Sequence, residues 1–412
     1  MAKQLLILGH VWPEPETTAA GSRMKQLLEA FKAMGYHIDF ASTATRTPHS
    51  MDLDSKGIST ASIELNNPSF DRFVKNLDPD FVVFDRFMVE EQFGWRVAEQ
   101  LPNAIRILNT EDLHSLRKAR EETHRAGEGF TVQQWMDHPM TLREVASIYR
   151  SDCSLLISSF EMELLEKNLG IPKALLLYLP FMVEGVSRET LEDWPSFEKR
   201  RDFVHIGNGR HRPNVDSIHL LKSELWPQIS KSLPGAKLHV HGAYLPQEVL
   251  EMHDPKTGFL VEGWTDDLKG TLQNARVLLA PLRFGAGIKG KLLDAMLHGI
   301  PSVTTTIGTE GMKGDRPWNG AVEDDPQSFA REAVELYQNR EKWEEAQSHG
   351  EGLILEHFDH RRHREALKGH LAQLERKLGV HRDQNFIGKI LQQEIHSSSK
   401  YMAKWIEAKN PL

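Results

Sequence analysis

The sequence predicts an α/β protein of two doubly wound domains that face each other across a cleft, followed by C-terminal helices. Three observations lead to this fold class. The chain has 412 residues, 40% of them apolar, which exceeds one ordinary core and favours two domains of roughly 200 residues each. Short apolar runs alternate with helical patterns through both halves, as in parallel βαβ units. A polar, charged segment without a sustained apolar period separates the two halves.

The first half is expected to form one domain over residues 1–190. Its strand candidates are short apolar runs separated by helical stretches such as residues 21–35. We expect strands at 4–12, 36–42, 80–85, 104–112 and 153–159. The longest apolar run, residues 174–183, reaches only about half the length that spans a bilayer, so it is interpreted as one or two buried strands.

The second half repeats this scheme over residues 200–350, which predicts a second Rossmann-like domain. We expect strands at 202–208, 237–243, 259–264, 277–282 and 301–306. The boundary between the domains falls near residues 185–200. Where two such sheets face each other, ligands bind in the crevice at the carboxyl ends of the strands, so functional motifs should follow strands.

Residues 351–412 have helical patterns. In the last pattern Phe386, Ile390, Trp405 and Ile406 can share one face, and we expect this face to pack on the protein. From His357 onward, eleven Lys or Arg residues stand against six acidic residues. This excess is interpreted as a solvated helical face, with contact to an anionic surface such as the inner membrane surface as the alternative hypothesis.

Composition and charge exclude several function classes. No segment is long and apolar enough for a transmembrane helix, and the first residues lack the features of a secretory signal. The single cysteine, Cys153, excludes an internal disulfide and fits a reducing compartment, so a cytoplasmic location is expected. The net charge of −8 gives no support to general nucleic-acid binding. No G-x-G-x-x-G follows the first strand, which argues against a dinucleotide-dependent oxidoreductase.

The strongest functional motif is the stretch APLRFGAGIKGKLLDAMLHGIPSVTTTIGTEGM, residues 280–312. It contains a strand, a glycine turn and a helix. Gly285 and Gly287 would let the backbone approach a ligand, while free N–H groups and the helix dipole favour an anion. Lys289 and Lys291 add positive charge that is costly to bury without an anionic partner, which predicts phosphate binding; a plain tight turn is the alternative. Asp294, in the helix, could accept hydrogen bonds from a ribose diol, or could be an ordinary solvated carboxylate.

This stretch resembles the signature of the GT-B glycosyltransferases of family 4, often called group 1, in the branch that carries GAGIKGK. The family has a glycine-containing turn, a segment -LLEAM--G-PVV-T---G-EG- whose last glutamate is matched by Glu310, and two glutamates separated by seven residues. Asp294 matches the second of that pair, whereas Ala286 stands at the first, which is thought to contact the transferred sugar. The resemblance covers most of the chain. It implies an acceptor-side N-terminal domain, a donor-side C-terminal domain, and final helices that cross back to the N-terminal domain.

The resemblance also implies cationic residues after the strand at 202–208. In the family this turn supplies an arginine and a lysine to the donor diphosphate. Asn208 stands where that arginine usually follows the glycine, so Arg210 or Arg212 would have to serve instead. The alternative is that these arginines face solvent at the rim of the cleft.

In the first domain, the resemblance implies two further positions. Gly21, in the family's first loop and helix, would allow close backbone approach to the donor or the acceptor. His114, which follows Asp112 at the end of a strand, is the candidate for the histidine that related enzymes place near the transferred sugar. A structural or exposed histidine is the alternative.

Two metal-like patterns are set aside, and neither a metal nor a cofactor is expected. Asp52 and Asp54 form an Asp-x-Asp pair in a polar loop, but the enzymes of this resemblance bind the diphosphate with cationic groups. His357, His360 and His363 could line one helix face, but neighbouring arginines would repel a cation.

These features predict an enzyme that moves a sugar from a UDP- or GDP-sugar to a carbohydrate, lipid-linked or small-molecule acceptor, with retention of configuration as in the family. Lys289 and Arg210 would stabilise the leaving diphosphate by fixed positive charge. Two alternatives stay open. One is a binding or scaffold protein that has lost catalysis, suggested by Ala286. The other is a non-hydrolysing nucleotide-sugar epimerase, whose carboxylate bases we do not locate.

Overall fold

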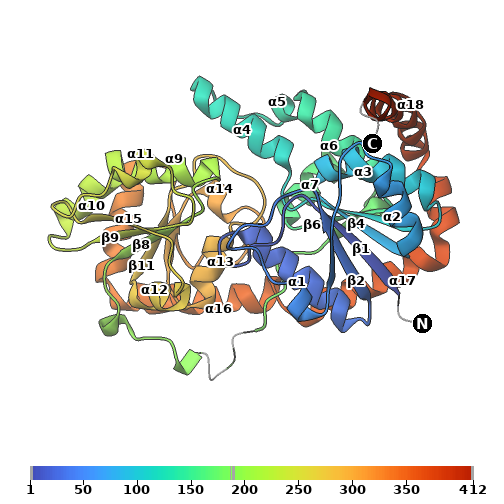
Figure 1. Ribbon diagram of the computed structural model, residues 1–412. Coiled ribbons are helices and arrows are strands. Elements are labelled where there is room, and N and C mark those ends of the chain that lie inside the picture. The colour runs from blue at the N-terminus through green and yellow to red at the C-terminus, as the bar shows by residue number, and fades with distance from the viewer. Residues whose placement is uncertain (1–2, 186, 188–190, 410–412) are drawn as a thin grey trace.

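The structure is a computed structural model that describes residues 3–185, 187 and 191–409, without the side chains of residues 394–400. Positions 186 and 188–190 of the predicted linker lie outside the described residues, as do both chain ends of the predicted domains. The described residues form two parallel sheets, one of seven strands and one of six, which confirms the predicted fold class (Figure 1).

The N-terminal domain is built on the seven-stranded sheet, in the order β3-β2-β1-β4-β5-β6-β7. Its strands are β1 (Gln4–Gly9), β2 (His37–Ser42), β3 (Ser59–Ser62), β4 (Phe81–Asp85), β5 (Ile105–Asn109), β6 (Cys153–Leu156) and β7 (Leu176–Tyr178). Its helices are α1 (Ala19–Ala33), α2 (Ser69–Leu77), α3 (Phe87–Gln100), α4 (His114–Ala126), α5 (Val132–Met136), α6 (Pro139–Arg150) and α7 (Ser159–Lys167). The strand order reverses between β1 and β4, which is where a doubly wound sheet opens its ligand crevice.

The C-terminal domain repeats this plan with the order β10-β9-β8-β11-β12-β13. Its strands are β8 (Phe203–Ile206), β9 (Leu238–His241), β10 (Phe259–Gly263), β11 (Val277–Ala280), β12 (Ser302–Thr304) and β13 (Gly320–Val322). Its helices are α9 (Arg212–Leu220), α10 (Trp226–Ser232), α11 (Gln247–Leu250), α12 (Leu268–Asn274), α13 (Gly290–Leu297), α14 (Thr306–Thr309), α15 (Pro326–Gln338) and α16 (Arg340–His357). Short 3₁₀ turns lie at Asp54–Lys56, Lys173–Leu175 and Phe197–Lys199, and a π-helical segment at Leu221–Leu225 joins α9 to α10.

The strands read as continuous apolar runs because both faces of each sheet are covered by helices. In β1, Leu6 and Leu8 enter one buried cluster and Leu5 and Ile7 enter another, as the two-residue period of a strand requires. All four side chains are fully buried. The central strands therefore hold the loops at their carboxyl ends on a rigid frame.

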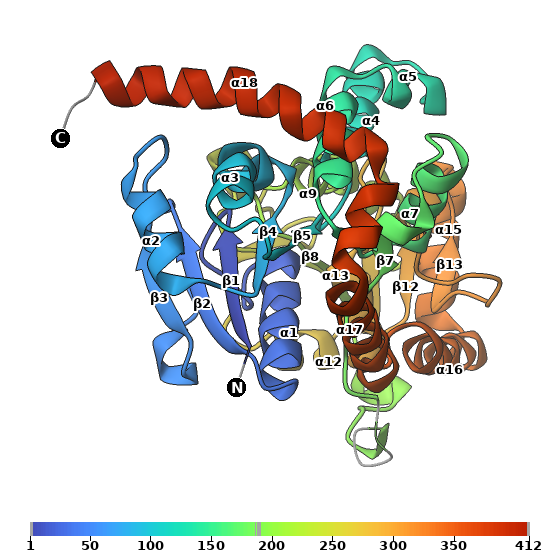
Figure 2. The ribbon, with the colours of Figure 1, turned by 90° about the vertical axis from the view of Figure 1, so that its right-hand side faces the viewer.

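Helix α17 (His360–Gln384) returns the chain to the N-terminal domain (Figures 1 and 2). Its side chains Leu367, Leu371 and Leu374 are buried in the same apolar cluster as Leu5 and Ile7 of β1. The outgoing and returning segments meet at Val183, whose N–H donates to the Phe358 carbonyl at 3.0 Å and whose carbonyl accepts from the His360 N–H at 3.1 Å.

Helix α18 (Phe386–Lys409) contradicts one prediction. Phe386, Ile390 and Trp405 are 69%, 44% and 55% exposed, so the prediction that they pack on the protein is wrong. The fourth residue of that prediction, Ile406, is half-buried. The helix contacts the rest of the protein through a different side, which carries Ala403, a residue that is 3% exposed. A small side chain at this position lets the helix approach its neighbours closely. None of the described helices is both long enough and apolar enough to cross a membrane.

We expect the crossing helix α17 to contribute directly to the stability of the N-terminal domain. Leu371→Ala removes a side chain that is 1% exposed and should lower the free energy of unfolding by about 2–5 kcal/mol. Val380→Ala, at a position of the same helix that is 60% exposed, should change it by less than about 0.5 kcal/mol. Urea titrations of both variants measure the difference, and equal losses would contradict the packing of α17.

Candidate active site

A cavity of about 880 Å³ lies between the two domains, within the size range of small-molecule sites. The N-terminal domain lines it with the loop after β1, with Asp85 and Arg86 at the end of β4, and with Glu111, Asp112, His114 and Arg117 after β5. The C-terminal domain lines it with the loops after β8, β9, β10 and β11 and with the first turns of α13. The cavity therefore lies at the carboxyl ends of both sheets.

The glycine turn after β11 packs against the other domain as well as facing the cavity. Gly287 has φ +65°, and a Cβ atom on it would lie 2.7 Å from the Cβ of Asp112. A Cβ on Gly290 would lie 2.6 Å from the Cβ of Ala19 in α1. A Cβ on Gly285, which has φ +156°, would make only ordinary van der Waals contacts, with Ile307 Cγ2 at 3.8 Å and Lys289 Cε at 3.9 Å. Gly287 and Gly290 thus allow the two domains to approach closely. From the sequence, the glycines of this turn were expected only to let the backbone approach a ligand.

Lys289 and Lys291 bring two buried or partly buried ammonium groups to the cavity wall at the start of α13. Lys289 Nζ donates to the Gly287 carbonyl at 2.8 Å, and Lys291 Nζ donates to Asn214 Oδ1 at 2.8 Å. Among the residues described, neither ammonium group has a carboxylate within 4.0 Å. Burial lowers the pKa of Lys289 to about 8 against the raising effect of Glu310, and burial lowers the pKa of Lys291 to about 7. Positive charge that lacks a direct ionic partner favours an anion in this part of the cavity.

Asp294 lies one turn after Lys291 in α13 and also lines the cavity. Burial raises the pKa of this carboxyl to about 7. A carboxyl group of this kind can accept or donate hydrogen bonds to neighbouring hydroxyl groups near neutral pH. The other acidic residue of the motif, Glu310, does not line the cavity.

Glu310 instead forms an ion pair between the domains. Its two carboxylate oxygens each accept from Arg120 in α4 at 2.7 Å, and the same guanidinium donates to the Gly285 carbonyl at 2.8 Å. Arg120 is 6% exposed. This buried arginine fixes the position of the glycine turn relative to the N-terminal domain.

Glu161, at the start of α7, makes a second link between the domains. One atom, Oε1, accepts from the Leu113 N–H at 3.0 Å and from the Gly287 N–H at 2.7 Å. The residue is fully buried, and burial together with the negative charge of Asp112 raises its pKa to about 8. The loop after β5 and the glycine turn after β11 are therefore held by one side chain.

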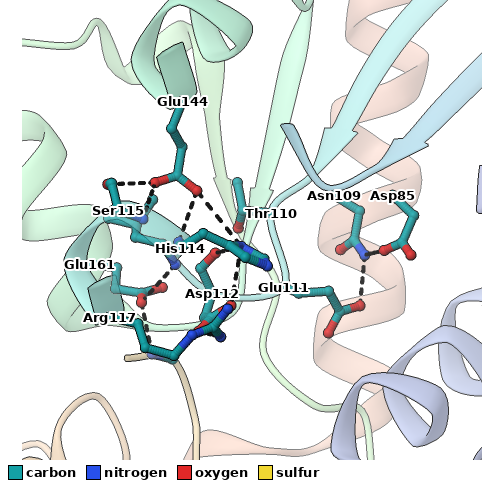
Figure 3. Close-up of polar contacts among 12 residues, drawn as sticks. Asp85, Asn109, Thr110, Glu111, Asp112, His114, Ser115, Arg117, Glu144 and Glu161 are labelled. Atoms are coloured by element: carbon teal, nitrogen blue, oxygen red, sulfur yellow. Dashed lines mark hydrogen bonds and ion pairs between the residues drawn. The ribbon is translucent and has the colours of Figure 1, made fainter. Parts of the chain in front are cut away.

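His114 begins α4 beside Asp112 and Arg117, as Figure 3 shows. Its Nδ1 lies 3.2 Å from the Asp112 carbonyl and 3.4 Å from Asp112 Oδ1. Burial lowers the pKa of His114 to about 3, although Asp112 raises it, so the ring is neutral at pH 7. Burial by itself would raise the pKa of Asp112, but Arg117 and His114 hold it well below its usual range. Nδ1–H directed at Asp112 leaves Nε2 as the acceptor nitrogen of the ring.

Glu144 supports this loop from α6. Its carboxylate accepts from the backbone N–H groups of His114 and Ser115 at 2.9 and 3.0 Å and from the Ser115 hydroxyl at 2.6 Å (Figure 3). Burial raises the pKa of Glu144 to about 7. These bonds satisfy donors at the start of α4 that a helix leaves free.

A separate acidic group lines the cavity at the ends of β4 and β5. Asn109 Nδ2 donates to Asp85 Oδ1 at 3.2 Å and to Glu111 Oε1 at 2.8 Å (Figure 3). Burial and Asp85 raise the pKa of Glu111 to about 7, while Arg23 and Arg86 act in the opposite direction. Glu111 and Arg86 both have positive φ angles, +62° and +77°, in a region that side chains other than glycine rarely occupy. Such conformations concentrate at ligand sites.

The structure separates the two arginines after β8. Arg210 lines the cavity, and its guanidinium stacks 3.7 Å from the ring centroid of Tyr244. Arg212, the first residue of α9, is exposed and does not line the cavity. Asn208 bridges the domains through a 3.2 Å bond from Nδ2 to the Thr17 carbonyl.

Gly21 lies in the first turn of α1, beside the cavity. Its N–H donates to Thr18 Oγ1, the N-cap of this helix, at 2.9 Å. A Cβ here would lie 2.3 Å from the Glu14 carbonyl carbon, so the close approach at Gly21 is between α1 and its own preceding loop.

The metal-like patterns of the sequence have other roles. His360 and His363 face the backbone carbonyls of Val183 and His357, and Asp52 accepts from the Ser55 N–H in a local turn. A different trio of described residues, His239, His241 and Glu262, has ligating atoms within 4.8 Å of one another. Both histidines already pair with Glu262, His239 at 2.8 Å and His241 at 3.1 Å.

Several site residues escaped the sequence analysis. Arg86 directly follows the predicted strand at 80–85, so the rule that functional side chains follow strands could have found it, whereas Glu111 lies inside the predicted strand at 104–112 and follows the strand only in the structure, where β5 ends at Asn109. Glu161 and Arg120 lie in ordinary helical patterns, and Tyr244 lies in a loop. For these three the sequence carries no local signal.

Comparison with known proteins gives a family match in the C-terminal domain. Residues 200–339 match the family described as Glycosyl transferases group 1. A protein of the cps region of Klebsiella pneumoniae, described as an uncharacterized 44.6 kDa protein, is 21% identical over 215 residues, which covers 50% of this chain and 53% of that protein. The match spans about half the length of this curated relative.

Solved structures resemble the chain over nearly its whole length. Sucrose-phosphate synthase from Thermosynechococcus elongatus aligns with a TM-score of 0.64 at 15% identity, covering 91% of this chain and 99% of that one. HepE of Anabaena in complex with UDP-glucose aligns with a TM-score of 0.66 at 12% identity, covering 90% and 100%. At these identities the likeness establishes the fold, the GT-B arrangement of two Rossmann-like domains around one cavity.

The buried carboxyl of Glu161 should make stability depend on pH. The folded protein holds this proton up to about pH 8, whereas the unfolded chain loses it near the ordinary value of 4.5. Between these values the folded state binds more protons, so the free energy of unfolding falls as pH rises. Glu161→Gln cannot lose a proton and should reduce the fall between pH 5 and pH 7.5 by about 1–3 kcal/mol.

Urea titrations at the two pH values measure this effect. Glu29→Gln is the matched control, because Glu29 is exposed on α1 and its substitution should leave the pH dependence unchanged. A Glu161→Gln variant with the same pH dependence as the unmodified protein would show that this carboxyl is ionised in the folded state.

Proposed function

We propose that this protein transfers a sugar from a nucleoside diphosphate donor to an acceptor hydroxyl. The match of residues 200–339 to the group 1 glycosyl transferases and the GT-B fold of the two domains support this proposal. The observation that carries the proposal is the pair of lysines at the glycine turn. Lys289 and Lys291 bring two cations to the cavity wall beside the N-terminus of α13, and their direct partners are neutral oxygens. A diphosphate is the anion that this arrangement fits.

Two further residues of the cavity would contact the nucleotide part of the donor and its diphosphate. Asp294 is placed to hydrogen-bond the ribose diol, as acidic residues do in nucleotide sites. Arg210, held against Tyr244, adds a third cation at the cavity. The solved structure of HepE contains UDP-glucose, which supports a uridine donor over a guanosine donor for this chain.

The chemistry we propose is electrostatic. The bond between the anomeric carbon of the sugar and the diphosphate oxygen breaks, and the acceptor oxygen forms the new bond to that carbon. The acceptor proton passes to the leaving phosphate oxygen, so charge and atoms balance without a covalent nucleophile on the protein. Lys289 and Arg210 stabilise the negative charge that develops on the diphosphate, which is the main contribution that fixed cations make. Attack on the same sugar face retains the configuration.

Residues of the N-terminal domain would position the sugar and the acceptor. The neutral ring of His114 offers Nε2 as an acceptor for a sugar hydroxyl, since Nδ1 faces Asp112. Asp85 and Glu111 offer carboxyl groups to acceptor hydroxyls on the same wall. The relative in the Klebsiella cps region supports an acceptor from polysaccharide synthesis. Neither a metal nor another cofactor is part of this proposal.

The decisive experiment incubates the purified protein with UDP- and GDP-sugars and measures the release of nucleoside diphosphate with and without acceptor. Acceptor-dependent release of the nucleoside diphosphate is the expected result. Conversion of the donor sugar without an acceptor would indicate an epimerase. Tight donor binding without any conversion would indicate a binding protein.

Lys289→Ala should weaken UDP binding by about 1–3 kcal/mol, the range of a charge-assisted hydrogen bond. Lys231→Ala, at an exposed lysine of α10, should leave the affinity unchanged and serves as the control. Isothermal titration calorimetry measures both. Unchanged affinity in Lys289→Ala would remove this lysine from the diphosphate position.

Asp294→Ala should weaken binding of a nucleotide sugar far more than binding of inorganic pyrophosphate, because only the nucleotide sugar carries the ribose diol. The comparison uses one variant and two ligands in the same calorimetric assay, so a general loss of folding affects both equally. Equal losses for the two ligands would point to a structural role for Asp294.

A further inference from the structure

Helix α18 is fixed to the N-terminal domain by its small and polar side chains. At its start, Asn385 Nδ2 donates to the Tyr149 carbonyl at 2.7 Å and Asn385 Oδ1 accepts from the Gly388 N–H at 2.9 Å. A Cβ on Gly388 would lie 2.3 Å from the Tyr149 carbonyl oxygen. One turn later, Gln392 Nε2 donates to the Arg150 carbonyl at 3.2 Å. The first turns of α18 therefore lie directly on the end of α6.

The far end of the helix is fixed in the same way. Ala403 is buried against the body, and Glu407 forms an ion pair with Arg96 of α3. Arg96 is 2% exposed and also pairs with Asp71 at 2.8 Å. Figure 2 shows the helix passing over α3 and α6 toward the C-terminus.

This attachment leaves the large apolar side chains of α18 facing solvent. Of the thirteen exposed large apolar residues among those described, six lie on this helix: Phe386, Ile387, Ile390, Tyr401, Met402 and Trp405. Five of them, all except Met402, fall within an arc of about 100° on the helix surface. A helix that evolved only to pack on its own domain would bury this arc, so the arc needs another partner.

The charged residues beside this arc indicate that its partner is anionic. Lys404 and Lys409 lie at its two borders, and among the described residues neither forms an ion pair. The Lys409 ammonium lies 3.8 Å from the ring centroid of Trp405. The acidic residue of this end, Glu407, points toward the body, where it pairs with Arg96. The outward face thus combines aromatic and aliphatic side chains with uncompensated positive charge, in a chain whose net charge is −8.

We infer that α18 is an interfacial helix that binds the surface of an anionic membrane through this arc. Tyrosine and tryptophan side chains favour the headgroup region, aliphatic side chains enter the upper acyl region, and lysines attract anionic lipids. A second copy of the chain is the less favoured partner, because each copy would bring the same uncompensated lysines to the shared face. At about 1.5 Å per residue, the 24-residue helix is about 36 Å long and would bring the N-terminal domain close to the bilayer along that length.

The test uses the full chain and vesicles of phosphatidylcholine with or without phosphatidylglycerol. The variant Phe386→Ser/Ile390→Ser/Trp405→Ser replaces three side chains that are exposed in the folded protein, so its melting temperature should not change. Leu355→Ser, at an exposed leucine of α16, is the matched control. A second variant, Lys404→Glu/Lys409→Glu, tests the charges.

The expected result is that the unmodified chain and Leu355→Ser co-sediment with anionic vesicles while the triple variant binds at least tenfold more weakly. The charge variant should lose several-fold in affinity, and binding to neutral vesicles should be weak. The inference is overturned if the unmodified chain does not bind, if the triple variant binds as well, or if neutral vesicles bind equally. It is also overturned if the triple variant instead dissociates a dimer in sedimentation equilibrium.

This inference does not depend on the reaction catalysed. UDP affinity of the triple variant, measured by calorimetry, should equal that of the unmodified chain, because none of the described side chains of α18 lines the cavity. A failure of vesicle binding and a failure of sugar transfer are therefore separate results.

Discussion

The site depends on the contact between the glycine turn after β11 and the loop after β5. Glu161 holds the backbone of both segments with one carboxyl oxygen, and Arg120 holds the turn and Glu310 with one guanidinium. Gly287 makes this contact possible because any side chain there would collide with Asp112. The buried groups of both links are costly to leave unpaired, so the two segments stay together only in this geometry.

The charge distribution of the cavity depends on this contact between the glycine turn and the loop after β5. Docking the turn buries Lys289 and brings it near Glu310, Glu161 and Asp112 without direct ion pairing. The same docking buries the loop that carries Asp112 and His114 and leaves the histidine neutral. The C-terminal side of the cavity carries the cations Arg210, Lys289 and Lys291 beside Asp294, and the N-terminal side carries the carboxyl groups of Asp85, Glu111 and Asp112 and the neutral His114 beside Arg86 and Arg117. The proposed reaction would use this distribution by placing the anionic leaving group at the three cations of the C-terminal side.

The two C-terminal helices show that apolar patterns have different uses within one segment. The leucines of α17 are buried under the N-terminal sheet, where they join the cluster of Leu5 and Ile7. The next helix, α18, also carries an apolar face but turns it outward, because its described contacts with the body use Gly388, Gln392, Ala403 and the ion pair of Glu407 with Arg96. The first helix stabilises the fold, and the second presents a surface.

The sequence by itself determined the fold class, the position of the glycine turn and the candidates Lys289, Asp294 and His114, because period, length and strand-end position are local properties. Only the tertiary structure decided between Arg210 and Arg212 as residues of the cavity, assigned Glu310 to an ion pair between the domains, and brought Glu161 and Arg120 to the site. It also reversed the prediction for the face of Phe386 and Trp405. The periodicity of a helix shows that one side is apolar, but which side meets the body depends on the shape of the surface beneath it.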